Sequence, residues 1–440
     1  MRAAIAIAIV CAAAPARANP ADLFGIGARG PAMGGAQVAA ADDATANYYN
    51  PALMARLDDI RIELGYQVAL PALAVDNQQL NVDSARGMDI NLAVPGKLGG
   101  ARLAFGAALY LPDQQITRLR NQSAQQPRFI EYDNLPQRIM LAANIAMSVG
   151  DRLSLGAGIS YMSSTKGAIS LRGLIGLPQP DDSQLALAMD VDLKTIRYAV
   201  LGAAYRLKPW LDVGVSYRGG FKLVVDLAFG IRGDVGSPGQ PPVVTNGHLD
   251  LTTISQDLFQ PAQYTAGFAA RLTPRFTLAF DLAYHRWSTF ENPSAHITID
   301  LDVGQFNDLV KIPPFSALPA PNFHDIVVPR LGMEWLAKQS EARALRVRAG
   351  YVYQPTPAPE QVGETNFIDD DRHVFSLGAG LELRHGLGEI VPRPLSLDAF
   401  VALTALEPRQ HRKLSPVDPI GDYRSGGHIW SMGVLSRWRF

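Results

Sequence analysis

Two short patterns in the sequence resemble enzyme motifs, and neither has the context that its chemistry needs. Gly25 to Gly30 satisfies GxGxxG, which binds a dinucleotide only between a strand and a helix. The pattern begins only a few residues after Ala18, where we expect a signal peptide to be cleaved, so the chain has no room for the strand that must precede the motif. Ser163 to Lys166 fits SxxK, but no Ser-Asp-Asn or Lys-Thr-Gly partner occurs, which favours a polar loop. The eight histidines form no HExxH and no close i, i+4 pair, so a zinc site has little support. We therefore expect no catalysis, no metal and no cofactor.

Two polar groups of residues could instead hold one segment against another. Asp42, Asp43 and the tripeptide Asn50-Pro51-Ala52 lie near the amino terminus, and Asp369-Asp370-Asp371-Arg372 lies far downstream. Pro51 fixes its own φ and biases Asn50 to extended backbone, while the Asn50 amide both donates and accepts hydrogen bonds. We expect Asp42 or Asp43 to lie near inward arginines or near Asn50. The alternatives are a simple turn at Asn50-Pro51 and a solvated charge run at residues 369–372.

The first 18 residues are typical of an export signal. Arg2 gives a positive start, Ala3 to Ala14 form an apolar run, and Ala16-Arg17-Ala18 fits the small-x-small cleavage pattern. The run is shorter than the roughly 17–25 residues that a spanning helix needs. We expect cleavage after Ala18. Cys11, the single cysteine, follows Val10 rather than the small residue of a lipoprotein signal, so the mature chain would contain no thiol.

Composition narrows the class of protein further. Without Arg2 and Arg17 the chain carries 38 basic and 41 acidic residues, so no basic field favours nucleic acid. Hydrophobic residues make up 48% of the chain, yet no apolar run after the signal approaches the length of a membrane helix. No linker, charge block or break in composition separates soluble domains.

The main regularity is an alternation of apolar and polar residues. Arg61–Leu70, Arg138–Val149, Phe276–Trp287 and Leu345–Tyr353 each place one oily and one polar face on a strand. A soluble antiparallel sheet would show the same period. We predict fourteen strands, at about 61–70, 88–94, 101–110, 138–149, 153–162, 185–207, 211–230, 248–272, 276–300, 325–337, 344–354, 372–384, 395–404 and 427–440.

The lengths of the connections favour a membrane barrel over a soluble sheet. Gly150-Asp151, Lys208-Pro209-Trp210 and Thr273-Pro274-Arg275 are tight turns. Long loops, at residues 111–137, 163–184, 231–247, 301–324 and 355–371, alternate with them. Short turns on one side, long loops on the other and an even number of strands are typical of outer-membrane barrels. The terminal Phe440, on an aromatic-rich last strand, resembles the signal by which such barrels are recognised for insertion.

The barrel assignment predicts which residues face the lipid and which face the lumen. Arg61, Asp281, Arg346 and Asp398 should point inward, whereas the outward set is Ile62, Leu141, Phe280, Val347 and Leu397. Wall side chains alone cannot fill a lumen of fourteen strands, so it is either plugged or a pore. The Gly/Ala-rich residues 19–55 cannot build a core of their own, and we expect them to be the plug, with residues 56–440 forming the barrel.

The amino-terminal residues resemble the hatch of the FadL-type family of outer-membrane transporters. The matching residues are Phe24 to Gly30, Met33 to Ala36, Ala41-Asp42-Asp43-Ala44 and Asn50-Pro51-Ala52. A second match, Arg348-Ala349-Gly350-Tyr351 followed by Asp369-Asp370-Asp371-Arg372, resembles a loop pattern of the family. Ile368 stands where the family has proline. A third, looser match is Ala283 to Ser288.

This resemblance implies passive transport of long-chain fatty acids or related hydrocarbons. Loops would capture the ligand, the hatch would move, and the ligand would leave sideways through the wall near a kink of the third strand, Ala101–Tyr110. Gly106, next to Phe105, is the natural weak point of that strand. The implied partners are a hydrophobic ligand and outer-membrane lipid, with no nucleic acid and a monomeric state. A non-transport barrel or accessory protein and a general porin remain as alternatives.

Overall fold

The computed structural model describes residues 23–113, 125–132, 138–176, 179–294, 296–309, 320–386, 393–416 and 418–440. The predicted signal peptide and its cleavage site lie outside these residues. Within the described residues, no helix is long and apolar enough to cross a membrane.

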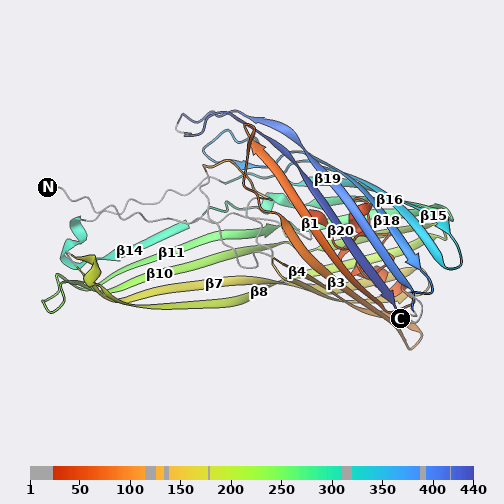
Figure 1. Cartoon of the computed structure of the whole chain (residues 1–440), viewed down its shortest axis with the longest axis horizontal. Helices are drawn as coiled ribbons and strands as arrows, with labels where there is room; N and C mark the ends of the chain where they lie inside the picture. Colours follow the sequence, from red (N-terminus) through yellow and green to blue (C-terminus); the bar gives the residue numbers. More distant parts are fainter. Residues whose placement is uncertain are drawn as a thin grey trace.

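Fourteen antiparallel strands close into a barrel (Figure 1). The last strand pairs with the first from Arg61↔Arg439 to Val75↔Ser425, which completes the ring. This confirms the predicted all-β antiparallel barrel and its fourteen strands. In order around the wall the strands are β1 (Arg61–Val75), β3 (Ala85–Leu98), β4 (Ala101–Pro112), β6 (Met140–Val149), β7 (Leu153–Gly176), β8 (Gln184–Lys208), β9 (Leu211–Arg218), β12 (Gln263–Thr273), β13 (Phe276–His285), β15 (Ile326–Gln339), β16 (Arg343–Gln354), β18 (Arg372–Leu383), β19 (Leu395–His411) and β20 (Tyr423–Arg439).

The two faces of the wall follow the predicted alternation. Asp281 and Asp398 are buried on the lumenal face, where Arg61 and Arg346 pair with Asp59 and Glu382. Phe280 is half-buried and packs against Phe268, with ring centroids 6.0 Å apart. The other predicted outward residues, Ile62, Leu141, Val347 and Leu397, are 36–47% exposed.

An arm of five strands projects beyond the barrel, toward the left of Figure 1. The outer halves of β7 and β8 continue past the wall and are joined by β10 (Phe221–Gly236), β11 (Val244–Gln260) and β14 (His296–Asp302). β10 runs parallel to β7, from Leu227↔Gly167 to Gly236↔Gly176. The arm therefore has the strand order β8-β7-β10-β11-β14.

The arm corrects several predicted boundaries. Residues 163–184 were expected to be a loop, but they are strand up to Gly176 and again from Gln184. Residues 231–247 likewise belong mostly to β10 and β11. The predicted strands 211–230, 248–272 and 276–300 are each two strands. The breaks fall at Gly219-Gly220, at Pro261, which has no N–H for a ladder, and at the η3 turn (Trp287–Thr289).

Short elements complete the described chain. The strands β5 (Arg128–Phe129) and β17 (Phe367–Ile368) form a separate parallel pair. The others are β2 (Gln78–Gln79), which pairs with β1, and the turns η2 (Pro180–Asp182) and η4 (Gly304–Leu309).

Residues 23–57, which we call the lumenal segment, lie inside the ring of strands and appear red in Figure 1. The segment contains α2 (Arg29–Ala32), α3 (Ala46–Tyr49) and η1 (Pro51–Arg56). α2 contacts β16, β18 and β19, whereas η1 contacts β3, β4, β6, β7 and β8 on the other side. Alanines of the wall, including Ala93, Ala104, Ala146 and Ala204, pack against η1 in one buried cluster. Small wall side chains thus leave room for the segment.

Glycines of the wall allow the closest approach. A Cβ on Gly202 of β8 would lie 3.0 Å from Pro51 Cδ and closer still to the Asn50 side-chain oxygen. A Cβ on Gly156 of β7 would lie 2.6 Å from the Pro51 carbonyl carbon. Any larger residue at either position must displace the segment.

This contact predicts the effect of a larger side chain at Gly202. Gly202→Leu should push Asn50 and Pro51 away from β8, cost about 1–3 kcal/mol of overpacking and raise the ionic conductance of the barrel in planar lipid bilayers. Gly96→Leu on β3 is the matched control, because no atom lies within 4 Å of a Cβ there. Equal conductance of the two variants and the wild type would contradict close packing of Asn50 and Pro51 against Gly202.

Candidate functional site

The buried acid of the lumenal segment is Asp43. Its carboxylate is 2.8 Å from Arg437 Nη2 of β20, and Arg437 Nε is 2.5 Å from Glu63 of β1. The backbone N–H of Ala44 also donates to Glu63, at 3.0 Å. These four residues join the segment to the two strands that close the barrel.

Asp42 has a different environment. Its side chain is 70% exposed, 3.5 Å from Arg29 Nε, while its carbonyl oxygen accepts from Arg61. Both predicted acids therefore lie near arginines, but only Asp43 is enclosed. A run of two adjacent acids does not indicate which one faces the protein interior.

Arg29 of α2 forms a second connection, which the sequence analysis missed. Its Nη1 donates to Gln37 Oε1 (2.6 Å) and to the Ala40 carbonyl (2.9 Å), and its Nε is 3.1 Å from Glu334 of β15. Glu334 is also 2.7 Å from Arg348 of β16. The signal available in the sequence was that Arg29 is the one charged residue of a Gly/Ala-rich stretch.

Asn50, Pro51 and Ala52 form a compact joint against β8. Asn50 is extended (φ −159°, ψ 101°), as the following proline favours. Its Nδ2 donates to the carbonyls of Val38 (2.6 Å) and Ala203 (3.2 Å), and its Oδ1 accepts from Ala52 N–H at 3.2 Å. The amide thus connects two parts of the segment to the wall and caps η1, which begins with Pro51.

Asn47 makes a fourth attachment, to β3, β4 and β6. Its Nδ2 donates to the Leu92 carbonyl at 2.8 Å, and Asn144 Nδ2 donates to its Oδ1 at 3.0 Å. The predicted weak point, Gly106, lies beneath it, because a Cβ there would collide with Asn47 and Met54. The pairing of β4 runs through this point without a register shift: Gly106 pairs with both Ala93 and Asn144, and Phe105 is 61% exposed.

A cavity of about 110 Å³ lies on the outer side of the segment. Tyr48 and Tyr49 line it with edge-to-face rings whose centroids are 5.1 Å apart. The Arg218 guanidinium lies 3.7 Å from the Tyr48 ring centroid and donates to the Tyr48 carbonyl at 2.6 Å. Asp281 accepts from Val38 N–H at 2.9 Å. Aromatic, aliphatic and cationic groups therefore meet in one chamber, which we call the lumenal chamber.

An aromatic cluster adjoins the lumenal chamber on the loop side. Phe290 and Phe323 have ring centroids 4.6 Å apart, and Trp287 lies 5.4 Å from Phe259. Val352 belongs to the cluster and also lines the chamber. The loops thus contribute a buried apolar surface directly next to the chamber.

The predicted loop motif holds the outer loops together. Arg372 pairs with Glu131 and donates to the Tyr132 hydroxyl, across 241 and 240 residues of sequence. Asp371 accepts from the Tyr353 hydroxyl (2.7 Å) and from Thr356 N–H (2.8 Å). Asp369 is buried and 3.8 Å from Arg372. These residues form a buried network and not a solvated charge run.

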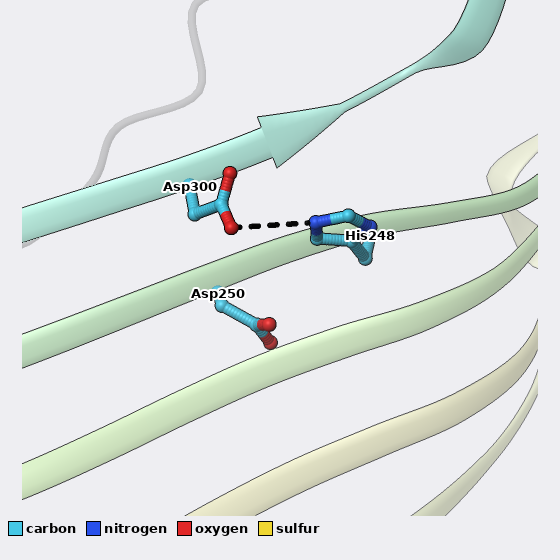
Figure 2. A group of neighbouring side chains, drawn as sticks. All are labelled: His248, Asp250 and Asp300. Atoms are coloured by element: carbon cyan, nitrogen blue, oxygen red, sulfur yellow. Dashed lines mark ion pairs between the residues drawn. The ribbon is translucent and has the colours of Figure 1, made fainter.

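One group of possible metal ligands occurs in the described residues. His248, Asp250 and Asp300 lie on the polar face of the arm with ligand atoms within 4.8 Å of one another (Figure 2). His248 Nε2 is 3.6 Å from Asp300, but Asp250 is 2.6 Å from Arg232. Because Arg232 competes with a cation for Asp250, we interpret the group as an exposed ion-pair network.

The environment of Asp370 predicts a pH-dependent loop. Burial raises the pKa of this carboxyl to about 6, although the hydroxyl of Ser425, which donates to it at 2.7 Å, lowers it. Burial also raises the pKa of Asp369 well above its ordinary value. The folded loop is therefore more stable when these two carboxyls are protonated and neutral. This stabilisation is complete below about pH 4 and is lost as the pH rises through about 6.

The size of the effect for Asp370 is about 3 kcal/mol, since one pKa unit corresponds to about 1.4 kcal/mol. Asp370→Asn should slow amide hydrogen exchange in residues 355–371 at pH 7.5 at least tenfold. It should also flatten the pH dependence of the protection of these amides, measured relative to exchange in an unfolded chain. Glu364→Gln, in an exposed part of the same loop, should change neither. Faster exchange in Asp370→Asn at pH 7.5 would show that the charged form stabilises the loop.

Comparisons with known proteins agree with this architecture. The family model described as "Outer membrane protein transport protein (OMPP1/FadL/TodX)" matches residues 7–388. The crystal structure of a Pseudomonas aeruginosa FadL homologue aligns with TM-score 0.53 and 16% identity over 98% of this chain and 99% of that one. The P. putida toluene transporter TodX aligns with TM-score 0.54 and 17% identity over 95% of this chain and 99% of that one.

The Ralstonia pickettii toluene transporter TbuX gives TM-score 0.50 and 16% identity over 95% of this chain and 99% of that one. A comparison with curated proteins found no match. At these identities the solved structures establish the fold, and the family model establishes the relationship. The chain belongs to the OMPP1/FadL/TodX family of outer-membrane transport proteins.

Proposed function

We propose that this protein is a passive transporter of hydrophobic compounds, with long-chain fatty acids or related hydrocarbons as its substrates. The observation that carries the proposal is the spatial order of the surfaces along the lumen. A buried aromatic cluster leads to the lumenal chamber, and the lumenal segment closes the path beyond it. Apolar pockets with a few polar anchors are typical of sites for such ligands.

The chamber supports a fatty acid over a neutral hydrocarbon. The solved relatives TodX and TbuX are named as toluene transporters, and another as a monoaromatic hydrocarbon channel, all with 16–17% identity to this chain. Here the chamber contains Arg218 against Tyr48, which offers a cation to a carboxylate beside an apolar surface. The chamber of about 110 Å³ is smaller than the roughly 150 Å³ cavity that holds one benzene, so a longer ligand requires the segment to move.

Movement of the segment would act as the gate. Asp43, Asn50, Pro51 and Ala52 hold the closed position against β20 and β8, and Asp42 lies at its rim. Residues 19–55 therefore function as a hatch in this proposal, with residues 56–440 as the surrounding barrel. A hatch shift breaks the attachments at Asp43, Arg29, Asn47 and Asn50 together, which favours two discrete positions.

Lateral release would occur where Asn47 now covers β4. If the hatch moves, Asn47 leaves the Leu92 carbonyl, and the wall loses its inner cover at Gly106, next to the outward-facing Phe105. Opening still requires β4 to separate from a neighbour, because its ladder is continuous. Coupling release to hatch movement keeps the wall closed until a ligand is present.

The alternatives predict different permeability. A general porin would pass small hydrophilic solutes, whereas the buried segment and the aromatic cluster favour their exclusion. A non-transport barrel that holds a partner would pass neither class. The loop motif Asp369, Asp371 and Arg372 would support any of the three by ordering the loops.

Transport in cells and liposomes tests the proposal. Deletion of the gene should abolish most uptake of a radiolabelled long-chain fatty acid, and the purified protein should not support liposome swelling in small sugars. Swelling in sugars would favour a porin. Unchanged fatty-acid uptake after deletion, with no swelling, would favour the accessory barrel.

The gate is tested at Asn50. Asn50→Ala removes two donated bonds and one accepted bond, which costs about 1–3 kcal/mol when such groups are buried. The hatch should then open more often, changing labelled fatty-acid uptake at equal surface levels without unfolding the barrel. Asn81→Ala, an exposed asparagine of an outer loop, is the control. If Asn50→Ala took up fatty acid and excluded polar solutes as the wild type does, Asn50-Pro51 would be interpreted as a simple turn.

A further inference from the structure

The arm of five strands has one polar and one apolar face. His248, Asp250 and Asp300 lie on the polar face (Figure 2), where Asp250 is also 2.6 Å from Arg232. Residues one position further along each strand point to the opposite face. There, one row of cross-strand partners crosses the whole width of the arm and consists of Met189, Ile169, Phe229, Leu251 and Ile299. The next row toward the tip, from Leu187 to Leu301, contains only leucine and isoleucine.

This apolar face of the arm is open. Leu187 is 64%, Met189 61% and Ile169 37% exposed, and Phe229 of the central strand is half-buried. The arm is five strands wide and, at β14, seven residues long, which gives a face of about 600 Å² at the usual strand spacing and rise. Apolar patches of more than a few hundred Å² mark surfaces that another molecule covers.

The apolar face continues the lipid-facing side of the barrel wall. In the wall, the odd-numbered residues of β7 and β8 face the lipid, and Leu155, Leu201 and Tyr205 are 38–47% exposed. The two strands pair without a register shift from Leu153↔Tyr205 to Leu174↔Gln184, so the odd-numbered positions stay on one side along both strands. The apolar face therefore belongs to the outer side of the molecule and not to the lumenal side.

Lipid chains do not reach this face. Tyrosines near the loop ends of the wall strands, among them Tyr161, Tyr264 and Tyr284, correspond to the aromatic girdle at the outer edge of the apolar band. The Arg197 guanidinium lies 5.9 Å from the Tyr161 ring centroid and places a charge at the same level. Ile169 is eight residues, or about 26 Å of strand, beyond Tyr161. The face thus lies in water, where its exposure is unfavourable.

We propose that a second copy of this chain covers the apolar face, with the two arms packed face to face. Two sheets pack in this way about 10 Å apart, with strand directions within about 30° of each other. Two copies in one membrane meet this condition, since both arms run away from the membrane. A two-fold axis along the membrane normal turns their outer sides toward each other. The contact buries about 1,200 Å² in total, at the lower end of specific interfaces.

Pairing through the free edge of the arm does not meet the same condition. β9 pairs with β8 only from Val200 to Lys208, and the pairings of the described residues leave the β8 edge from Gln184 to Ile196 without a neighbour. Antiparallel pairing of two such edges reverses the strand direction, which takes the second barrel out of the shared membrane. Edge pairing also leaves the apolar rows in water. The proposed dimer departs from the monomeric state that the family resemblance implies, and it does not depend on transport.

Cysteine crosslinking in intact outer membranes tests the contact. Cys11→Ala in every variant leaves the introduced cysteine as the only thiol of the chain. Ile231→Cys lies on the apolar face of the central strand β10 and should give a covalent dimer with a bismaleimide that spans about 10 Å, the usual separation of packed sheets. Ala228→Cys, exposed on the polar face of the same strand, should stay monomeric.

Charges on the apolar face should separate the two copies. Leu187→Glu combined with Met189→Glu should lower the crosslinked fraction of Ile231→Cys at least fivefold, because both positions are exposed in one copy and covered in the dimer. Ala186→Glu combined with Ala188→Glu adds the same charges to the polar side of the same strand and should leave crosslinking unchanged. Heat-modifiable migration in electrophoresis verifies that each barrel is folded.

Three results would overturn the proposal. The first is a crosslinked fraction of Ile231→Cys that is zero or equal to that of Ala228→Cys, and the second is crosslinking that persists in the Leu187→Glu, Met189→Glu background. The third is slower maleimide labelling of Ile231→Cys in the presence of a long-chain fatty acid without any dimer, which would assign the face to a ligand. None of these measurements depends on uptake, so the dimer and the transport function fail separately.

Discussion

Fourteen strands enclose a lumen that their own side chains cannot fill, and the rest of the structure depends on how this space is closed. Residues 23–57 lie inside it, although they are too rich in glycine and alanine to form a core by themselves. Their position is therefore fixed by the wall. Asp43 is attached to β20, Asn47 to β3 and β6, and Asn50 to β8, so the segment is held across the lumen and not at one edge.

Buried charges make this position specific. A buried ion pair adds little net stability compared with apolar packing, but removing one partner costs about 3–5 kcal/mol because the other is left unpaired. Arg437 joins Asp43 to Glu63, and Arg29 joins α2 to Glu334. A small displacement of the segment would weaken both sets of contacts without providing new ones. The buried charges therefore specify one position of the segment in the lumen.

Period-2 alternation was sufficient to predict the wall, because lipid on one side and a polar lumen on the other impose it on every strand. The same alternation continues into the arm, where Ile169, Met189 and Phe229 occupy matching positions on β7, β8 and β10. Periodicity does not identify a strand's neighbour, so the arm and its parallel pairing could not be predicted. The breaks at Gly219-Gly220 and Pro261 were visible only as residue types.

The site was predicted less completely than the wall, for a related reason. Asp43 and Asn50 were identified through local motifs, and the structure places both in buried contacts. The roles of Asn47 and Arg29 depend on partners 45 and 305 residues away, and no local pattern encodes such pairs. The wall arginines that line a second cavity, on the other side of the segment, are likewise scattered over six strands or strand ends, and only closure of the barrel brings them together.

Acids and hydrocarbons meet the same surfaces along the proposed path but interact with them differently. A neutral hydrocarbon gains free energy in the aromatic cluster and has no comparable attraction to Arg218. The tail of an acid can bury in the same cluster, while its carboxylate must exchange water for a cation at each step. Arg218 of the lumenal chamber offers such a cation. Both classes of ligand can therefore enter by the same apolar route, but only the acid finds an oppositely charged partner in the chamber.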